Sequence, residues 1–367
     1  FKKSFNKIKK FNIYKLMLSL KKKFLPLIIP FIILIFPLSL KVTNNTDIFF
    51  RLGLKDLILL KWEVYSAEVC CDFPTDFEIK NIKKIDLSNF EGHNKQGEFR
   101  VYDPFVYLEN GSEKILYEAV FFNEQSNFDI TINSALINDD VAIENKILIN
   151  PSHKVSYPQI INLENEKKIV SLEEAQSEEG YPNIYLFENN QLTYVNTPIH
   201  KRLIDVTYLK HNGIFFAFGT DYNLNNNGKL RIFYGEDIMS AKFTEHPLSP
   251  LTSNKSANNT AGTFLRIKDK IYRFTMNNKN SLREGINLYE ISKLNINEFD
   301  EKLIKTNILS SVKKKYTNIK KIHHISFIDK QYNEGRLKIY FDAAHEWKVK
   351  MHDKEIRGNF SLFHSTK

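Results

Sequence analysis

Five stretches of the chain begin in the same way, and this repetition constrains the fold more than any other feature. Each stretch places one polar or turn-forming residue at the head of a short run of β-branched and aromatic residues. The segment 101–107, with the sequence VYDPFVY, is the first of them. The opening residues lie 54, 48, 57 and 62 residues apart and are Asp103, Tyr157, Asp205, Gly262 and His324. Repeats of this length are typical of an architecture built from similar supersecondary units.

Each opening is followed, after turns rich in Asn, Asp, Gly and Pro, by further short runs of strand-forming residues. Five units of three or four strands predict an all-β fold, a five-bladed β-propeller whose first strands line the central axis. A strand expected at 62–65 would complete the last blade and close the ring. A β-sandwich is the alternative, although that fold does not need five similar openings.

The net charge of +9 comes from the N-terminus and not from the predicted propeller. Residues 1–23 hold nine lysines and no acidic residue, and the remainder has equal numbers of basic and acidic side chains. A neutral body lacks the positive surface that nucleic-acid binding requires, so we expect no nucleic-acid partner.

The basic arm precedes an uncharged stretch, 24–40, with the sequence FLPLIIPFIILIFPLSL. Lysines followed by an apolar run are typical of a membrane anchor or a signal segment. The alternative is a buried core helix, and three prolines weaken the stretch as a helix of either kind. We expect an anchor that keeps the arm inside and places the propeller on the exterior, periplasmic or lumenal side.

These features divide the chain into five parts. They are a basic arm (1–23), an anchor or signal segment (24–40), a linker with a short amphipathic helix (41–61), the propeller (62–350) and a tail (351–367). The chain has two cysteines, the adjacent Cys70 and Cys71. Because a disulfide between neighbouring residues is geometrically awkward, we expect two buried free thiols.

Carboxylates at the predicted axis are the candidates for catalysis. Cleavage of a glycosidic bond uses two carboxyl groups, one protonated as the acid and one ionised as the base. Asp103 and Asp205 begin axial strands, and Glu118 and Glu173 lie on second strands near the same mouth. A turn-forming Asp-Pro pair is the alternative for Asp103, and a solvated run of charges is the alternative for Glu173.

Other residues are expected to bind a substrate at this mouth, by stacking, by hydrogen bonds or by forming its wall. They are Tyr157, Glu174, His246, Tyr272, Arg273 and His324. The imidazole of His324 is the expected contact for a water or cation in the channel. We otherwise expect no cofactor and no metal ligands, because the sequence has no paired-cysteine zinc motif and no Gly-rich phosphate loop.

The order of these motifs resembles one propeller family. The motifs are DPFVY at 103–107, VSYPQI at 155–160, IDVTY at 204–208, HPLSP at 246–250, TAGTF and IYRF within 260–274, and HHISF at 323–327. In this order they are similar to the N-terminal domain of plant glucosamine inositolphosphorylceramide transferase. That domain is itself similar to five-bladed furanosidases such as family-43 glycoside hydrolases, so the resemblance implies a propeller that acts on or binds sugars.

In the furanosidases an Asp of the first blade is the general base and an Asp of the third blade tunes the acid. The resemblance assigns these roles to Asp103 and Asp205. The acid of the furanosidases is a Glu of the fourth blade, but the fourth opening here, at 258–262, has no carboxylate. The acid therefore stays open between Glu118 and Glu173.

Three functions stay open as well. The chain is a glycosidase-like enzyme, a noncatalytic module that binds a glycan or glycolipid, or a domain that works with a glycosyltransferase partner.

Overall fold

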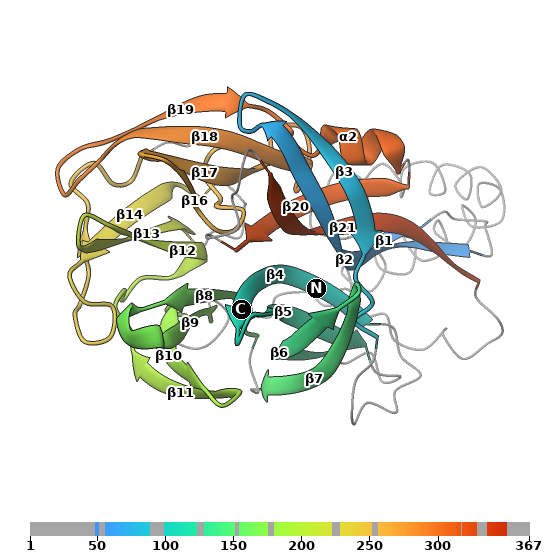
Figure 1. Ribbon diagram of the computed structural model, residues 1–367, viewed down its shortest axis with the longest axis horizontal. Helices are drawn as coiled ribbons and strands as arrows, with labels where there is room; N and C mark the ends of the chain where they lie inside the picture. The colour runs from blue at the N-terminus through green and yellow to red at the C-terminus, as the bar shows by residue number, and fades with distance from the viewer. Residues whose placement is uncertain are drawn as a thin grey trace, which may run out of the picture. The chain divides into compact units, whose positions relative to one another are not determined.

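The computed structural model describes residues 48–50, 56–88, 99–122, 128–150, 154–174, 180–221, 228–251, 256–316, 318–328 and 336–350. The compact unit that contains Lys61–Glu346 is built from five antiparallel sheets arranged around an axis (Figure 1). The all-β, five-bladed propeller predicted from the repeats is confirmed.

Blades 1 to 4 each consist of four strands consecutive in the chain. Blade 1 contains β4 (Phe99–Glu109), β5 (Ser112–Phe122), β6 (Phe128–Asn138) and β7 (Val141–Ile149). Blade 2 contains β8 (Ser156–Asn162), β9 (Lys168–Glu173), β10 (Asn183–Glu188) and β11 (Gln191–Asn196). Blade 3 contains β12 (Leu203–His211), β13 (Ile214–Asp221), β14 (Leu230–Gly235) and β15 (Thr244–Glu245). Blade 4 contains β16 (Leu265–Ile267), β17 (Lys270–Asn277), β18 (Gly285–Leu294) and β19 (Phe299–Lys305).

Blade 5 joins segments from both halves of the chain and so closes the ring. Its strands are β20 (Ile319–Phe327), β21 (Leu337–Lys350), β2 (Asp56–Asp72) and β3 (Asp76–Lys84), paired in that order. In Figure 1 the blue strands β2 and β3 lie beside the red strands β20 and β21. This pairing confirms that the strand predicted at 62–65 completes the last blade. It also leaves no open edge between the first and last segments of the propeller.

The remaining described elements are short. They are the 3₁₀ helix η1 (Glu164–Glu166), the helix α2 (Ser310–Lys315) and β1 (Ile48–Phe50), which pairs with residues 57–59 of β2. Among the described residues, no helix is long and apolar enough to cross a membrane. The predicted basic arm (1–23), anchor (24–40) and tail (351–367) lie outside the described residues.

The amphipathic helix predicted within 41–61 is wrong for the part that the structure describes. Residues 56–60 begin the long strand β2 instead. From residue 60 the buried apolar residues Leu60, Trp62 and Val64 alternate with Lys61 and Glu63, the period of a strand, and β1 pairs with residues 57–59.

Four of the five predicted openings share one backbone feature. Asp103, Tyr157, Asp205 and Gly262 all have a positive φ, at +50°, +53°, +54° and +112°. In β4, β8 and β12 the pairing register shifts across this residue, so each opening is a β-bulge. β20 has its own shift immediately before His324. Because a bulge bends a strand and redirects its side chains, the repeated bulge aims the opening residues toward a common region.

Gly262 shows why the fourth opening differs from the others. A Cβ atom at this position would lie 1.7 Å from the backbone oxygen of Ile325 in blade 5. Only glycine permits this approach, and it also tolerates the φ of +112°. The predicted strand at 260–265 is therefore reduced to isolated bridges at Thr260 and Gly262, and regular pairing begins at Leu265.

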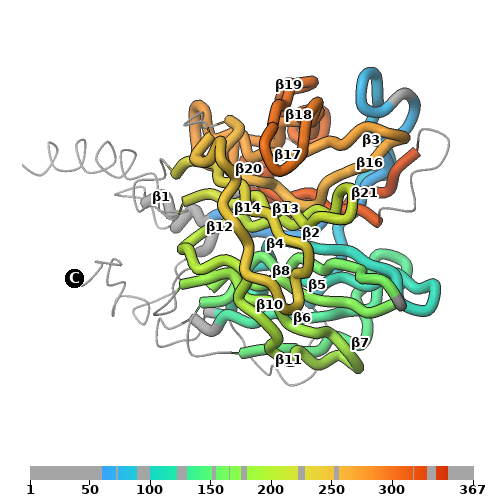
Figure 2. The backbone as a smooth tube through the Cα atoms, turned by 90° about the vertical axis from the view of Figure 1, so that its left-hand side faces the viewer, coloured from blue at the N-terminus to red at the C-terminus, as the bar shows by residue number. Residues whose placement is uncertain are grey.

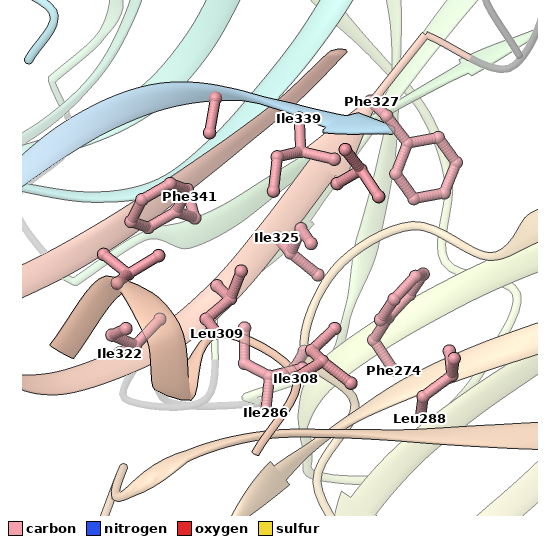
Figure 3. Close-up of a cluster of buried hydrophobic side chains, with 14 of the residues drawn as sticks. Phe274, Ile286, Leu288, Ile308, Leu309, Ile322, Ile325, Phe327, Ile339 and Phe341 are labelled. Carbon is pink, nitrogen blue, oxygen red and sulfur yellow. The ribbon is translucent and has the colours of Figure 1, made fainter. Parts of the chain in front are cut away.

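Neighbouring blades pack through apolar layers. Figure 3 shows the layer between blades 4 and 5, where Phe274 and Leu288 of blade 4 face Ile325 and Phe327 of blade 5. The innermost strands contact one another around the ring, β20 with β4, β4 with β8, and β8 with β12. β4 and β8 also lie side by side in the view turned by 90° (Figure 2). These contacts bring the openings of different blades together.

Cys70 and Cys71 are free thiols, as predicted, but they are not buried. Cys70 is partly exposed and Cys71 is exposed, because both lie at the end of β2, next to the β2–β3 turn. The prediction of two buried thiols is wrong.

Candidate active site

Asp103 opens β4 of blade 1, but the groups that hold it come from blade 5. Its amide N–H donates a hydrogen bond to Oδ2 of Asp342 over 3.1 Å. Its Oδ1 lies 3.1 Å from Nε2 of His323, and Nδ1 of the same ring lies 2.7 Å from Oδ2 of Asp342. All three side chains are buried. His323 therefore bridges two carboxylates at the junction of blades 1 and 5.

This bridge fixes the charges of its members. Burial alone would lower the pKa of His323, but the carboxylates of Asp342 and Asp103 raise it to about 9. Burial would raise the pKa of Asp103, but His323 lowers it to about 2. Near neutral pH the bridge is an imidazolium between two carboxylates.

The same three side chains offer donor atoms within 4.8 Å of one another, a spacing that suits a metal ion. Metal binding requires a neutral imidazole, whereas both ring nitrogens of His323 face carboxylates and its pKa of about 9 favours the protonated ring. A proton bridge describes this arrangement better than a metal site.

Glu118 of β5 and Glu173, the last residue of β9, hold their protons unusually strongly. Burial raises the pKa of Glu118 to about 7 and that of Glu173 to about 8, and nearby carboxylates add to both shifts. Lys154, which precedes β8, interacts with both glutamates and opposes the shifts. Glu118 is 4% exposed, whereas Glu173 and Lys154 are partly exposed. Of the two protonated groups, Glu173 is therefore the more accessible.

We expect Lys154→Met to raise the pKa of both Glu118 and Glu173 further, because the substitution removes the cation that stabilises their charged forms. Carboxyl ¹³C NMR titration of the two glutamates measures the change. Lys210→Met is the matched control, since Lys210 is exposed and pairs with the distant Glu164. Unchanged pKa values in Lys154→Met would contradict the coupling.

Asp205 of blade 3 completes the set of acidic groups. Its amide N–H donates to Oε2 of Glu173 over 2.9 Å, and its Oδ2 accepts a hydrogen bond from Nδ2 of Asn259 over 2.6 Å. Burial raises the pKa of Asp205 to about 6, although the bond from Asn259 lowers it. In turn the charge of Asp205 raises the pKa of Glu173. The charge of Asp205 thus favours the protonated form of Glu173, whereas the hydrogen bond from the Asp205 amide favours its ionised form.

Arg283 adds a second cation to the cluster. Its positive charge lowers the pKa of Asp103, Glu118 and Asp205. Its guanidinium lies 5.4 Å from the ring centroid of Trp62, and the Trp62 ring contacts His323 edge-on at 4.9 Å. The loop before β18 therefore takes part in the same electrostatic network as the axial openings.

Two of the predicted substrate-binding residues lie in the buried layer among the inner strands. The hydroxyl of Tyr157 is 2.7 Å from Oγ1 of Thr207 and accepts the amide N–H of Gly262 over 2.8 Å. The ring of His324 packs edge-on against Phe105 and Tyr157, and it has no hydrogen-bond partner among the described residues. Burial lowers the pKa of His324 to about 4, so the ring is neutral. The water or cation expected at His324 stays a prediction.

The other four predicted substrate-binding residues contact other parts of the propeller. Glu174 accepts a hydrogen bond from the hydroxyl of Tyr185 over 2.7 Å. His246 faces the backbone oxygen of Asn295 over 3.0 Å, and Tyr272 is buried in the layer between blades 4 and 5. Arg273 makes an ion pair of 2.6 Å with Glu301. None of the contacts just named involves a carboxylate of the cluster.

The cluster therefore contains Asp103, Glu118, Glu173 and Asp205, as predicted, together with residues that were not predicted. The additional residues are Lys154, Asn259, Arg283 and Asp342. His323, which belongs with His324 to the predicted axial histidine pair, also lies in the cluster. Asp342 had a recognisable signal, because a carboxylate between Phe341 and Ala343 in an apolar strand needs buried partners. Lys154 and Arg283 precede strands in polar segments, where sequence alone does not distinguish them from surface cations.

The chain matches one family model over more than half of its length. A family model described as glucosamine inositolphosphorylceramide transferase 1, N-terminal, matches residues 88–337. A search of curated proteins gives no match.

Among solved structures, a thermostable family-43 glycoside hydrolase is similar at 11% identity and a TM-score of 0.48, over 72% of this chain and 94% of that one. The catalytic domain of the GH62 α-L-arabinofuranosidase of Coprinopsis cinerea is similar at 12% identity and a TM-score of 0.47, over 70% and 94%.

Proposed function

Because the chain belongs to the family of the glucosamine inositolphosphorylceramide transferase 1 N-terminal domain, we propose that its propeller acts on glycans or glycolipids at the axial cluster. The observation that carries this proposal is the division of the clustered carboxyl groups into two protonation states. Asp103 is ionised, whereas the pKa of Glu173, about 8, keeps it mostly protonated near neutral pH, and the pKa of Glu118 is about 7. Cleavage of a glycosidic bond requires this combination of an ionised and a protonated carboxyl group.

The roles follow from exposure and charge. Asp103 is the proposed base, and Glu173 is the proposed acid because it is protonated and more exposed than Glu118. Asp205 is the proposed modulator, since its charge raises the pKa of Glu173 and its amide orients the Glu173 carboxylate. Lys154 limits the pKa of both glutamates, which keeps the acid able to release its proton.

A noncatalytic sugar-binding module is the second candidate, and one observation favours it. Asp103 is only 6% exposed and lies 3.1 Å from an imidazolium nitrogen. A carboxylate with a pKa of about 2 is a weak base. In a noncatalytic module the same polar groups bind the hydroxyl groups of a sugar without breaking a bond.

The setting is proposed from the sequence. The segment 24–40 would tether the propeller to a membrane, with the cluster on the exterior, periplasmic or lumenal side, where a glycolipid is within reach. A glycosyltransferase is the proposed protein partner, since the family description names a transferase.

A panel of aryl furanosides and pyranosides tests the catalytic proposal. We expect the wild-type chain to release the aryl group from at least one substrate and Asp103→Asn to lose this activity, because the variant lacks the ionised base. Asp139→Asn is the matched control, since Asp139 is an exposed aspartate of the same blade, between β6 and β7. A wild-type rate no higher than that of Asp103→Asn on every substrate would overturn hydrolysis. Glycan-array binding that survives in Asp103→Asn would then support the binding module.

A further inference from the structure

The adjacent thiols of Cys70 and Cys71 lie closer together than strand geometry normally allows. Their Sγ atoms are 3.0 Å apart, although both residues belong to β2 and pair with β3. Successive side chains of a strand point to opposite faces of the sheet, which separates neighbouring thiols. The short distance therefore requires a local departure from the strand conformation.

The backbone of Cys71 provides that departure. Its φ is +81°, in a region that residues other than glycine rarely adopt unless they are Asn, Asp or His. Such a conformation is strained and persists only where the surrounding structure imposes it. Here the register pairs Cys70 with Glu78 and Cys71 with Phe77, and the amide of Phe73 donates back to the Cys71 carbonyl over 3.1 Å. Cys71 is therefore the strained residue, and its conformation brings the two thiols together.

A cation lies beside the pair. The Nζ atom of Lys80 lies 2.7 Å from Oε2 of Glu78, and the pKa of Lys80 is raised by Glu78 and also by Cys70. The hydrogen bond between the two thiols raises the pKa of Cys71, so Cys71 is the less reactive first nucleophile. Cys71 is exposed and Cys70 partly exposed, so a soluble thiol reagent can reach them.

We propose that Cys70 and Cys71 form a reversible dithiol–disulfide site that exchanges with a low-molecular-weight disulfide such as glutathione disulfide. The Cys70 thiolate attacks one sulfur of glutathione disulfide, which forms a mixed disulfide and releases a glutathione thiolate. The Cys71 thiolate then attacks Sγ of Cys70, which forms the Cys70–Cys71 bond and releases the second glutathione. The two cysteines lose two electrons and two protons, and the products are two glutathione thiols.

A disulfide between Cys70 and Cys71 is labile because the two residues are adjacent in the chain. Adjacent Cα atoms are about 3.8 Å apart across a trans peptide, whereas ordinary disulfides span about 4.4–6.8 Å. Strain of this kind makes a disulfide easier to reduce, which is the property of exchangeable rather than structural bonds. The site therefore changes between dithiol and disulfide as the ratio of reduced to oxidised glutathione around it changes.

The test is a redox titration of the purified full chain in buffers of different ratios of reduced to oxidised glutathione. Free thiols are alkylated at each ratio, and the peptide that contains both cysteines is analysed by mass spectrometry. We expect loss of both alkylatable thiols in oxidising buffer, with a bond within one peptide, and complete recovery in reducing buffer. Recovery should occur at ratios that leave the disulfide of a stable secreted protein intact.

The variants separate the two steps. Cys70→Ser and Cys71→Ser should each accumulate a glutathione adduct, since no second thiol can release it. Lys80→Gln should slow the first step, with Lys83→Gln as the matched control because Lys83 is an exposed lysine of β3 that pairs with Asp140.

Several outcomes would overturn the proposal. They are two thiols that stay alkylatable at every ratio, a stable glutathione adduct in the wild type, and a disulfide between two chains. Binding of one Zn²⁺ per chain that needs Glu78 would also overturn it, because Cys70, Cys71 and Glu78 offer donors within 4.8 Å of one another. The wild-type titration decides the matter even if a variant does not fold.

Discussion

Glu173→Gln is expected to lower the turnover of a glycoside with a poor leaving group by about 10²–10⁴-fold, the usual contribution of a general acid. Glutamine keeps the shape of the side chain but cannot donate a proton to the leaving oxygen. The pKa of Glu173, about 8, keeps the residue protonated at neutral pH, and its partial exposure makes the proton accessible. Steady-state rates on substrates of matched structure measure the loss.

The pH dependence identifies the acid independently of the size of the loss. The active form has Glu173 protonated, so the rate is retained below pH 8 and falls as the pH rises through about 8. If Glu118 were the acid, the fall would come near pH 7. Substrates with a strongly activated leaving group need less protonation, so the defect of Glu173→Gln should shrink for them.

Glu118→Gln is the comparison within the cluster, and Glu188→Gln is the control outside it. A larger loss in Glu118→Gln than in Glu173→Gln would transfer the role of the acid to Glu118. Equal rates in the wild type and both cluster variants would exclude either glutamate as the acid.

The axial openings were predictable because each of them is an exception to strand propensity. Asp103 and Asp205 stand inside apolar runs, where a carboxylate is costly without partners, and the same exception recurs at regular intervals. The structure gives the physical reason, a β-bulge with positive φ at each of these residues. Repetition of a local exception predicted both the fold class and the region where the carboxyl groups cluster.

The surroundings of the residues expected to bind a substrate were harder to predict because side chains alternate along a strand. Glu173 and Glu174 are neighbours, and sequence alone gives no reason to prefer one. In the structure Glu173 interacts with Asp205, whereas Glu174 accepts a hydrogen bond from Tyr185. Tyr272 and Arg273 were likewise chosen for their chemistry, yet both are buried between or within blades. A shift of one residue along a strand moves a side chain to the opposite face of the sheet. Only the pairing register shows which face each side chain occupies.

The cations of the site depend on contacts between distant segments. Lys154 and Arg283 influence Glu118 across different blades, so no local pattern marks them among the 52 basic residues of the chain. The outer strands β7, β11, β15 and β19 carry a weaker sequence signal than the inner strands. Their exposed faces carry polar residues, which dilutes the apolar alternation that marks the inner strands.

Asp342→Asn is expected to destabilise the propeller by about 3–5 kcal/mol at pH 6, the usual cost of removing one partner from a buried ion pair. Asp342 accepts the amides of Asp103 and His324 and faces Nδ1 of His323, and it is fully buried. A neutral asparagine cannot stabilise the imidazolium. Urea unfolding of the wild type and the variant measures the loss of free energy, with the exposed Asp300→Asn as the control.

The loss should depend on pH in a direction that the pKa values determine. The pKa of His323 is raised from 6.5 to about 9, so its stabilisation is complete below pH 6.5 and disappears as the pH rises through 9. The pKa of Asp103 is lowered from 3.8 to about 2, so its stabilisation is present above pH 3.8 and disappears as the pH falls through 2. The difference between wild type and variant is therefore expected to be largest between these limits and smaller near pH 10.

The charges that face His323 set this expectation. Asp342 and Asp103 raise its pKa, and Arg283 opposes them. An equal loss at pH 6 and near pH 10 would mean that Asp342 acts through its amide hydrogen bonds alone and not through the imidazolium. If Asp342→Asn does not fold, NMR titration of His323 in the wild type tests the same bridge, and a pKa near 6.5 would contradict it. A pKa near 9 would establish that blade 5 fixes the charge of the proposed base in blade 1.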